Sequence, residues 1–164
     1  MFIDGPRFRG ILQLVFGSAP PTLTVVEAET IVRIGYLAID IDLEEDSAEL
    51  VMVEALSDQI CALAGIAPSM ISPLSPLPTD DEERAVRVRQ LASRLTRTPS
   101  RELAYVVAYV LIVADLELSP VESRLLLELE TVLEVSEDRT SELAAQAAEM
   151  LTPPPSPEET RTET

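Results

Sequence analysis

The chain has 164 residues, of which 46% are hydrophobic and only 4% are aromatic, and it contains no Trp. A core built mainly from Leu, Val, Ile and Ala favours helices packed on helices within one domain. The formal net charge of −17, from 29 acidic and 12 basic residues, argues against nucleic acid or an anionic membrane surface as a partner.

The residues that most enzymes use are scarce. The chain contains no His and no Lys, and Cys61 is its single cysteine. These absences remove the usual general base, Schiff-base chemistry and any intramolecular disulfide, so we expect a protein that is not an enzyme. The lone cysteine lies in an apolar stretch, where a buried and unreactive thiol is expected, and a free thiol fits a reducing compartment. No apolar run reaches the roughly 20 residues that a membrane-spanning helix needs, so we predict a cytoplasmic protein without a transmembrane span.

Two helices are predicted at the start of the chain. The first can be capped by Asp4 and ended by Gly17. The second begins at Thr24, extends to about Ile41, and has Glu27 at the spacing of a capping box, in which a hydroxyl and a carboxylate each accept from a backbone N–H. Its expected buried stripe contains Val25, Ala28, Val32, Ala38 and Ile39.

A third helix and a linker follow. The helix starts at Asp46, where Glu49 again has the capping-box spacing, and it stops at Gly65. Its expected buried stripe contains Leu50, Val53, Leu56, Ile60 and Leu63. Residues 66–79 include four prolines, which cannot continue a helix, so we predict an exposed linker.

Four more helices are predicted in the second half. The first opens with Asp80, and the arginines between residues 84 and 101 indicate a solvated face or a docking site on its outer side. The second covers residues 102–114, and its match to the first half favours helix over strand. The third starts with the N-cap Ser119, and the fourth starts at Ser136 and ends near residue 151.

Two segments of the chain are similar at a constant offset of 73 residues. Residues 35–49 align with residues 108–122, which places an aromatic residue and three acidic residues in register. Each copy predicts a helix, an acidic turn and a second helix. The expected pseudo-repeats cover about residues 22–65 and 99–151.

We therefore predict an all-α fold, a compact helical bundle of about seven helices built from two pseudo-symmetric helical hairpin repeats. One domain is expected over residues 1–152. Residues 153–164 form a Pro-rich, polar tail that has little to bury, and we predict that this tail is disordered.

The two acidic turns are the candidate functional site. The candidate metal ligands are Asp42, Glu44, Asp46 and Glu49 in the first turn, and Asp115, Glu117 and Glu122 in the second. Carboxylates without His or clustered thiolates suit Ca²⁺ or Mg²⁺, and no organic cofactor is expected. The alternative is that these acids only cap helices, since a capping pair such as Ser119 and Glu122 is worth about 1 kcal/mol without any ligand.

The second half of the chain resembles the TerB family of tellurite-resistance proteins and its TerB-like relatives. Asp115, Leu118, the Ser119-Pro120 pair and Glu122 carry this resemblance. The first half matches more weakly, through its acids at positions 42, 46 and 49, and Leu residues stand at positions 43 and 116, where the family often has Gly. The resemblance implies an all-helical fold with two pseudo-symmetric halves, acidic residues that bind a divalent cation, and a role in stress responses near the membrane.

Two functions follow from these observations. The protein is either a cation-binding, TerB-like module of a stress-response or tellurite-resistance-type system, or a metal-independent module that recruits another protein, targets the chain to an assembly or associates with itself. The second function would use the helical surface, the arginine-rich face or the Pro-rich tail.

Overall fold

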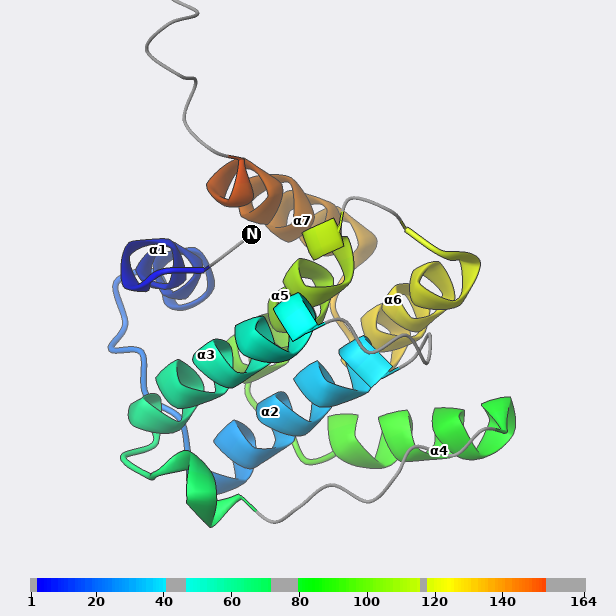
Figure 1. Ribbon diagram of the computed structural model, residues 1–164, viewed down its shortest axis with the longest axis horizontal. Coiled ribbons are helices and arrows are strands. Elements are labelled where there is room, and N and C mark those ends of the chain that lie inside the picture. The colour runs from blue at the N-terminus through cyan, green and yellow to red at the C-terminus, as the bar shows by residue number, and fades with distance from the viewer. Residues whose placement is uncertain (1–2, 41–46, 72–79, 116–117, 153–164) are drawn as a thin grey trace, which may run out of the picture.

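The computed structural model describes residues 3–40, 47–71, 80–115 and 118–152. Within these ranges the chain forms seven α-helices, two short 3₁₀ helices and no strand (Figure 1). The prediction of an all-α fold is thus confirmed. The predicted tail, residues 153–164, lies outside the described residues.

The helices follow one another in the predicted order. The α-helices are α1 (Gly5–Phe16), α2 (Val25–Asp40), α3 (Ser47–Leu63), α4 (Asp81–Ala92), α5 (Thr98–Ile112), α6 (Pro120–Val132) and α7 (Glu137–Leu151). The 3₁₀ helices are η1 (Pro68–Met70), after α3, and η2 (Val113–Asp115), which continues α5.

Side-chain caps explain where several helices begin. The carboxylate of Asp4 accepts from the backbone N–H of Arg7 at 2.9 Å, and Asp80 caps α4 in the same way. Ser119 and Ser136 cap α6 and α7, as predicted. Helix α5 begins four residues earlier than expected, at Thr98, because Pro99 in its first turn has no N–H that would need a partner.

Helices α3 and α6 end in the same backbone motif. After α3, Gly65 has a φ of 68°, and the N–H of Ile66 donates to the carbonyl of Cys61 at 3.1 Å. After α6, Glu134 has a φ of 55°, and the N–H of Val135 donates to the carbonyl of Glu130 at 3.2 Å. Both are Schellman motifs, in which a residue in the left-handed region closes the helix. Glu134 therefore occupies a position where Gly is the usual residue.

Helix α5 lies in the middle of the molecule. It is buried along most of its length and packs against α1, α2, α3, α6 and α7 (Figure 1). Gly35 allows its close approach to α2, because a Cβ atom there would lie 3.3 Å from the Leu111 side chain and 3.4 Å from Val107 and Val53. The buried apolar side chains of all these helices form one cluster, which agrees with the Leu, Val, Ile and Ala core predicted above.

Three expectations about exposure need correction. Leu50 and Val25 were assigned to buried stripes, but they are 46% and 51% exposed. Leu50 lies beside the stripe of α3 that faces the core of the protein, and Val25 is the first residue of α2. In the predicted linker, residues 67–70 are exposed as expected, but Ile66 and Ile71 are partly buried against the core; residues 72–79 lie outside the described ranges.

Candidate functional site

The structure describes only part of the two acidic turns. Asp42, Glu44, Asp46 and Glu117 lie outside the described residues. The backbone of Asp115 ends η2, and its side chain is also outside the description. The two remaining candidate ligands, Glu49 in α3 and Glu122 in α6, are both buried.

The carboxylate of Glu122 belongs to a helix cap. Its Oε2 accepts from the backbone N–H of Ser119 at 2.7 Å, and its own backbone N–H donates to the Ser119 hydroxyl at 3.2 Å. This reciprocal pair is the capping box that the sequence predicted, and Thr24 and Glu27 form the same box at the start of α2. Glu122 thus has a structural use in the absence of any ion.

The grouping of the seven candidate ligands stays a prediction. Among the residues that the structure describes, no three acidic or cysteine side chains are placed together to hold a metal ion. Most of the candidate ligands are not among those residues. This finding therefore bears on Glu49 and Glu122 and does not test metal binding by the other acids of the turns.

The helices that lead into the acidic turns do approach each other. Gly35 is five residues from the end of α2, and Leu111, its neighbour, is next to the end of α5. A Cβ atom on Gly35 would lie only 3.3 Å from Leu111, so the close approach of the two helices is near the C-terminal ends of both. Neither last turn contains a basic residue, so the negative end of each helix dipole has no cation from its own helix.

Two ion pairs with a buried carboxylate join segments that are distant in the sequence. Arg97 donates to both oxygens of Glu27 at 2.7 and 2.6 Å, and Arg139 donates to both oxygens of Glu102 at 3.0 and 2.8 Å. Each guanidinium also donates to a backbone carbonyl, of Thr22 and Leu14 respectively. The hydrogen bonds with Glu102 and Glu142 raise the pKa of Arg139 further above its ordinary value, so its charge is permanent.

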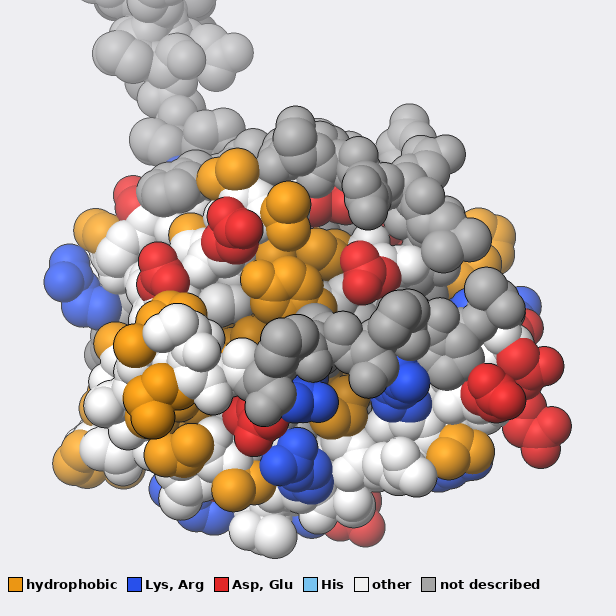
Figure 2. All heavy atoms as spheres, turned by 60° about the horizontal axis from the view of Figure 1, so that its bottom comes forward, with side chains coloured by type: hydrophobic (Ala, Val, Ile, Leu, Met, Phe, Trp, Pro, Cys, Tyr) orange, Lys and Arg blue, Asp and Glu red, His pale blue; other side chains and the backbone are white. Residues whose placement is uncertain are grey.

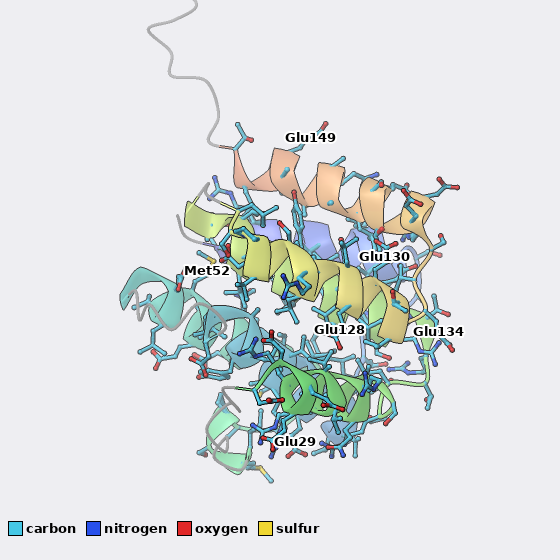
Figure 3. All side chains as sticks on the ribbon, turned by 90° about the vertical axis from the view of Figure 1, so that its right-hand side faces the viewer. Glu29, Met52, Glu128, Glu130, Glu134 and Glu149 are labelled. Carbon is cyan, nitrogen blue, oxygen red and sulfur yellow. The ribbon has the colours of Figure 1, made fainter. Side chains whose placement is uncertain are left out.

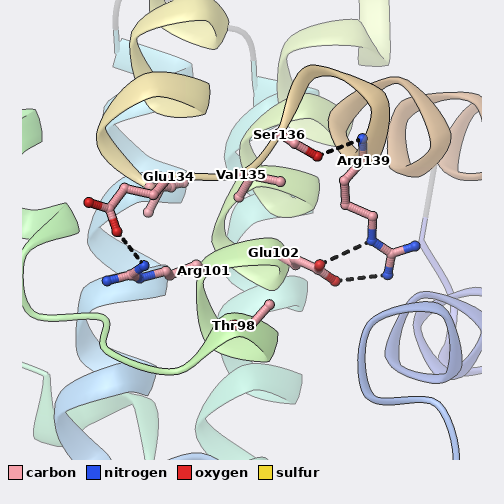
Figure 4. Close-up of a pocket in the computed structure, with 8 residues that line it drawn as sticks. Thr98, Arg101, Glu102, Glu134, Val135, Ser136 and Arg139 are labelled. Carbon is pink, nitrogen blue, oxygen red and sulfur yellow. Dashed lines mark hydrogen bonds and ion pairs between the residues drawn. The ribbon is translucent and has the colours of Figure 1, made fainter.

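A pocket of about 240 Å³ lies where α5 and α7 begin and α6 ends (Figure 4). The Arg139–Glu102 pair lines one side, and the other side is lined by Arg101, whose Nη1 donates to Glu134 at 2.7 Å. Glu134 is the second residue after α6, on the side from which the chain enters α7 (Figure 3). The remaining lining residues are Thr98, Leu133, Val135 and Ser136.

The arginine-rich segment only partly fits the expected solvated face. Arg94, Arg97 and Arg101 pair with acids on other elements, namely Glu29, Glu27 and Glu134. Arginine side chains gather near the middle of the face that carries α2 and α4 (Figure 2). Much of this positive charge therefore balances acids of the same chain, which the run of arginines alone did not reveal.

Sequence reasoning missed the pocket entirely. Its charged residues come from positions 101, 102, 134 and 139, which have no motif spacing, and no local signal relates them.

Comparisons of the chain with known protein families, with curated proteins and with solved structures found no match. Within the described ranges, none of the helices combines the length and the hydrophobicity that a membrane span requires.

Proposed function

We propose that this protein is a non-enzymatic, acidic, TerB-like module that binds a divalent cation, Ca²⁺ or Mg²⁺, with carboxylates of its two repeated turns. The observation that carries this proposal is the close contact of α2 and α5 at Gly35, near the ends of the two helices that precede the turns. Acids on two neighbouring turns could share one ion, which acids on opposite sides of the molecule could not.

The packing of the helices supports two pseudo-symmetric hairpins. Helices α2 and α5 pack on each other, α3 packs on α2, and α6 packs on α5. The helix before each hairpin packs on the first helix of the other hairpin: α1 contacts α5, and α4 contacts α2. An approximate two-fold relation between the halves would produce this exchange of partners.

Electrostatics gives a reason for a cation at this place. Acids follow the C-terminal ends of α2 and α5, where the helix dipole already places partial negative charge. The net charge of −17 on the chain adds electrostatic repulsion to that between these acids and the helix ends. A bound divalent cation would offset both effects, and Ca²⁺ tolerates the irregular ligand geometry of such turns. We place this binding in a stress-response or tellurite-resistance-type system, as the resemblance to TerB implies.

Thermal unfolding tests the proposal. Protein stripped with a chelator is titrated with Ca²⁺ and then Mg²⁺ at about 0.15 M salt, where long-range screening is strong. An ion held at 100 times its dissociation constant should add about 2.7 kcal/mol to the free energy of unfolding. The Asp42→Asn/Asp115→Asn double variant should lose this gain, because it removes one proposed ligand from each turn.

A second double variant controls for net charge. Glu82→Gln and Glu83→Gln remove the same two negative charges from the exposed first turn of α4. This variant should keep the saturable response to the ion. A weak, unsaturated response that is equal in all three proteins would overturn the cation site and show that the ion only screens charge.

A metal-independent interaction module is the second candidate. Exposed apolar side chains on and beside α6 favour it: Leu118 is 52% exposed, Val121 37% and Leu127 65%. Exposed apolar side chains are common in protein interfaces, so another protein or a second copy could dock on this part of the molecule. Failure of the ion titration would favour this candidate.

A further inference from the structure

We propose that the pocket beside Arg101 binds a carboxylate group, which takes the place of the Glu134 carboxylate on the Arg101 guanidinium. The pocket is formed by α5, α7 and the connection between α6 and α7, and it shares no residue with the acidic turns, so this inference does not depend on cation binding.

Arg101 is held in position before any ligand arrives. Its Nε donates to the backbone carbonyl of Leu95 at 2.8 Å, and its side chain is only 28% exposed. A guanidinium fixed in this way presents its remaining N–H groups in a planar fork that matches a carboxylate. The receiving group is thus already ordered, which reduces the entropy lost on binding.

The present partner of Arg101 is easily displaced. The side chain of Glu134 is 73% exposed and contacts Arg101 through one hydrogen bond of 2.7 Å. Exposed ion pairs of this kind are worth about 0 to 1 kcal/mol, so displacing Glu134 adds little to the entropy that an incoming carboxylate loses on association.

The opposite side of the pocket is rigid. Glu102 and Arg139 are joined by two hydrogen bonds, and Arg139 also donates to Leu14 and Glu142. The Glu102 side chain is only 10% exposed, so separating this pair would leave a buried charge unpaired. The pair therefore stays in place, on the side of the pocket away from the Arg101 guanidinium (Figure 4).

The backbone of Glu134 points to a use for its side chain. With a φ of 55° it occupies the left-handed position that Gly65 fills after α3. A residue with a Cβ costs about 1 kcal/mol more than Gly in this conformation. Such residues often occur at functional sites, and here the strained residue carries the carboxylate that pairs with Arg101 at the side of the pocket. The Glu134 carboxylate thus occupies the place on Arg101 that the carboxylate of the ligand would take.

The size of the pocket limits the ligand. Its volume of about 240 Å³ is below the range of about 300 to 1,000 Å³ typical of sites for drug-sized molecules. A small organic acid fits this volume, and so does an Asp or Glu side chain of a peptide. Both present the same carboxylate to Arg101.

NMR titration of ¹⁵N-labelled protein at constant ionic strength, about 0.15 M, tests the proposal. Succinate should shift the amide signals of Val135 and Ser136 in a saturable way, and uncharged succinamide should not. The Glu134→Gln variant should bind succinate about two- to fivefold more tightly, because the competing carboxylate is gone. Glu137→Gln, which removes a nearby exposed charge outside the pocket, should leave the affinity unchanged.

Substitution of the arginine completes the test. Arg101→Lys keeps the positive charge but loses the planar fork, and we expect about tenfold weaker binding. Arg101→Gln should abolish the shifts in protein whose circular dichroism spectrum still shows the folded helices. Binding that is unchanged in Glu134→Gln, or equal for succinate and succinamide, would overturn the proposal.

A peptide separates the two sources of the carboxylate. Acetyl-Ala-Glu-Ala-amide carries one side-chain carboxylate and no free terminus. Saturable shifts with this peptide but not with succinate would identify an acidic segment of a partner protein as the ligand, and the reverse would identify a small organic acid. If neither compound produces saturable shifts, the pocket does not bind carboxylates.

Discussion

Leu129→Ala is expected to lower the free energy of unfolding by about 2 to 5 kcal/mol. Leu129 lies on α6, and its side chain is fully buried, with 0% exposure. Truncation removes apolar contacts and leaves a cavity between helices that cannot collapse completely, so the loss exceeds the simple transfer free energy. Urea unfolding followed by far-ultraviolet circular dichroism measures the change.

The same helix provides a matched control. Leu127 is two residues away and 65% exposed, so Leu127→Ala makes the same chemical change where little is buried. We expect it to alter the free energy of unfolding by about 0.5 kcal/mol or less. Leu56→Ala, at a position of α3 that is 1% exposed, should behave like Leu129→Ala. Equal effects at positions 127 and 129 would contradict the packing of α6 described above.

Arg97→Met is expected to cost about 3 kcal/mol, near the lower end for breaking an ion pair that contains a buried charge. It leaves the Glu27 carboxylate, whose side chain is 5% exposed, without its cation. Arg97 itself is 45% exposed, which places the effect at the low end of the range. The substitution also removes the hydrogen bond to the Thr22 carbonyl, which links the segments that precede α2 and α5.

Acid should remove the contribution of this ion pair. The Arg97 guanidinium and the Thr24 N–H outweigh the effect of burial and lower the pKa of Glu27 from 4.5 to about 2. The unfolded chain therefore binds the proton first as the pH falls, and the stabilisation is complete above pH 4.5 and is lost between pH 4.5 and about 2.

The Glu27→Gln variant separates this effect from that of other acids. It keeps a side-chain oxygen for the capping box but cannot titrate. The difference in free energy of unfolding between wild type and variant should shrink as the pH falls from 5 toward 2.5, as measured by urea unfolding. A difference that stays constant over this range would show that Glu27 does not titrate as described.

The sequence predicted the order and the ends of the helices well because these depend on neighbours in the chain. The capping boxes at Thr24 and Ser119 each involve residues three positions apart, and both formed as expected. The left-handed residue at Gly65 closes α3 in the same local way. Errors came where a neighbouring helix decides the outcome, as for Leu50, whose side of α3 is left exposed.

The two candidate sites also differ in whether their residues are close together in the chain. The acidic turns could be found from the sequence because their carboxylates are close together in the chain, and whether they meet around an ion remains a prediction. The pocket could not be found, because Arg101 meets Glu134 across 33 residues and Glu102 meets Arg139 across 37. Nothing in the local pattern distinguishes these charges from others on the surface.

The sequence by itself determined an all-α protein, most helix boundaries, the acidic composition and the absence of His and Lys chemistry. Only the tertiary structure decided that α5 lies in the middle of the molecule, that Arg97 reaches Glu27 across 70 residues, and that a pocket lined by two ion pairs forms beside α7. The physical reason is the distance along the chain over which each kind of interaction acts. Caps and periodicity act within one or two turns of a helix, whereas ion pairing and burial depend on which helix surfaces pack together.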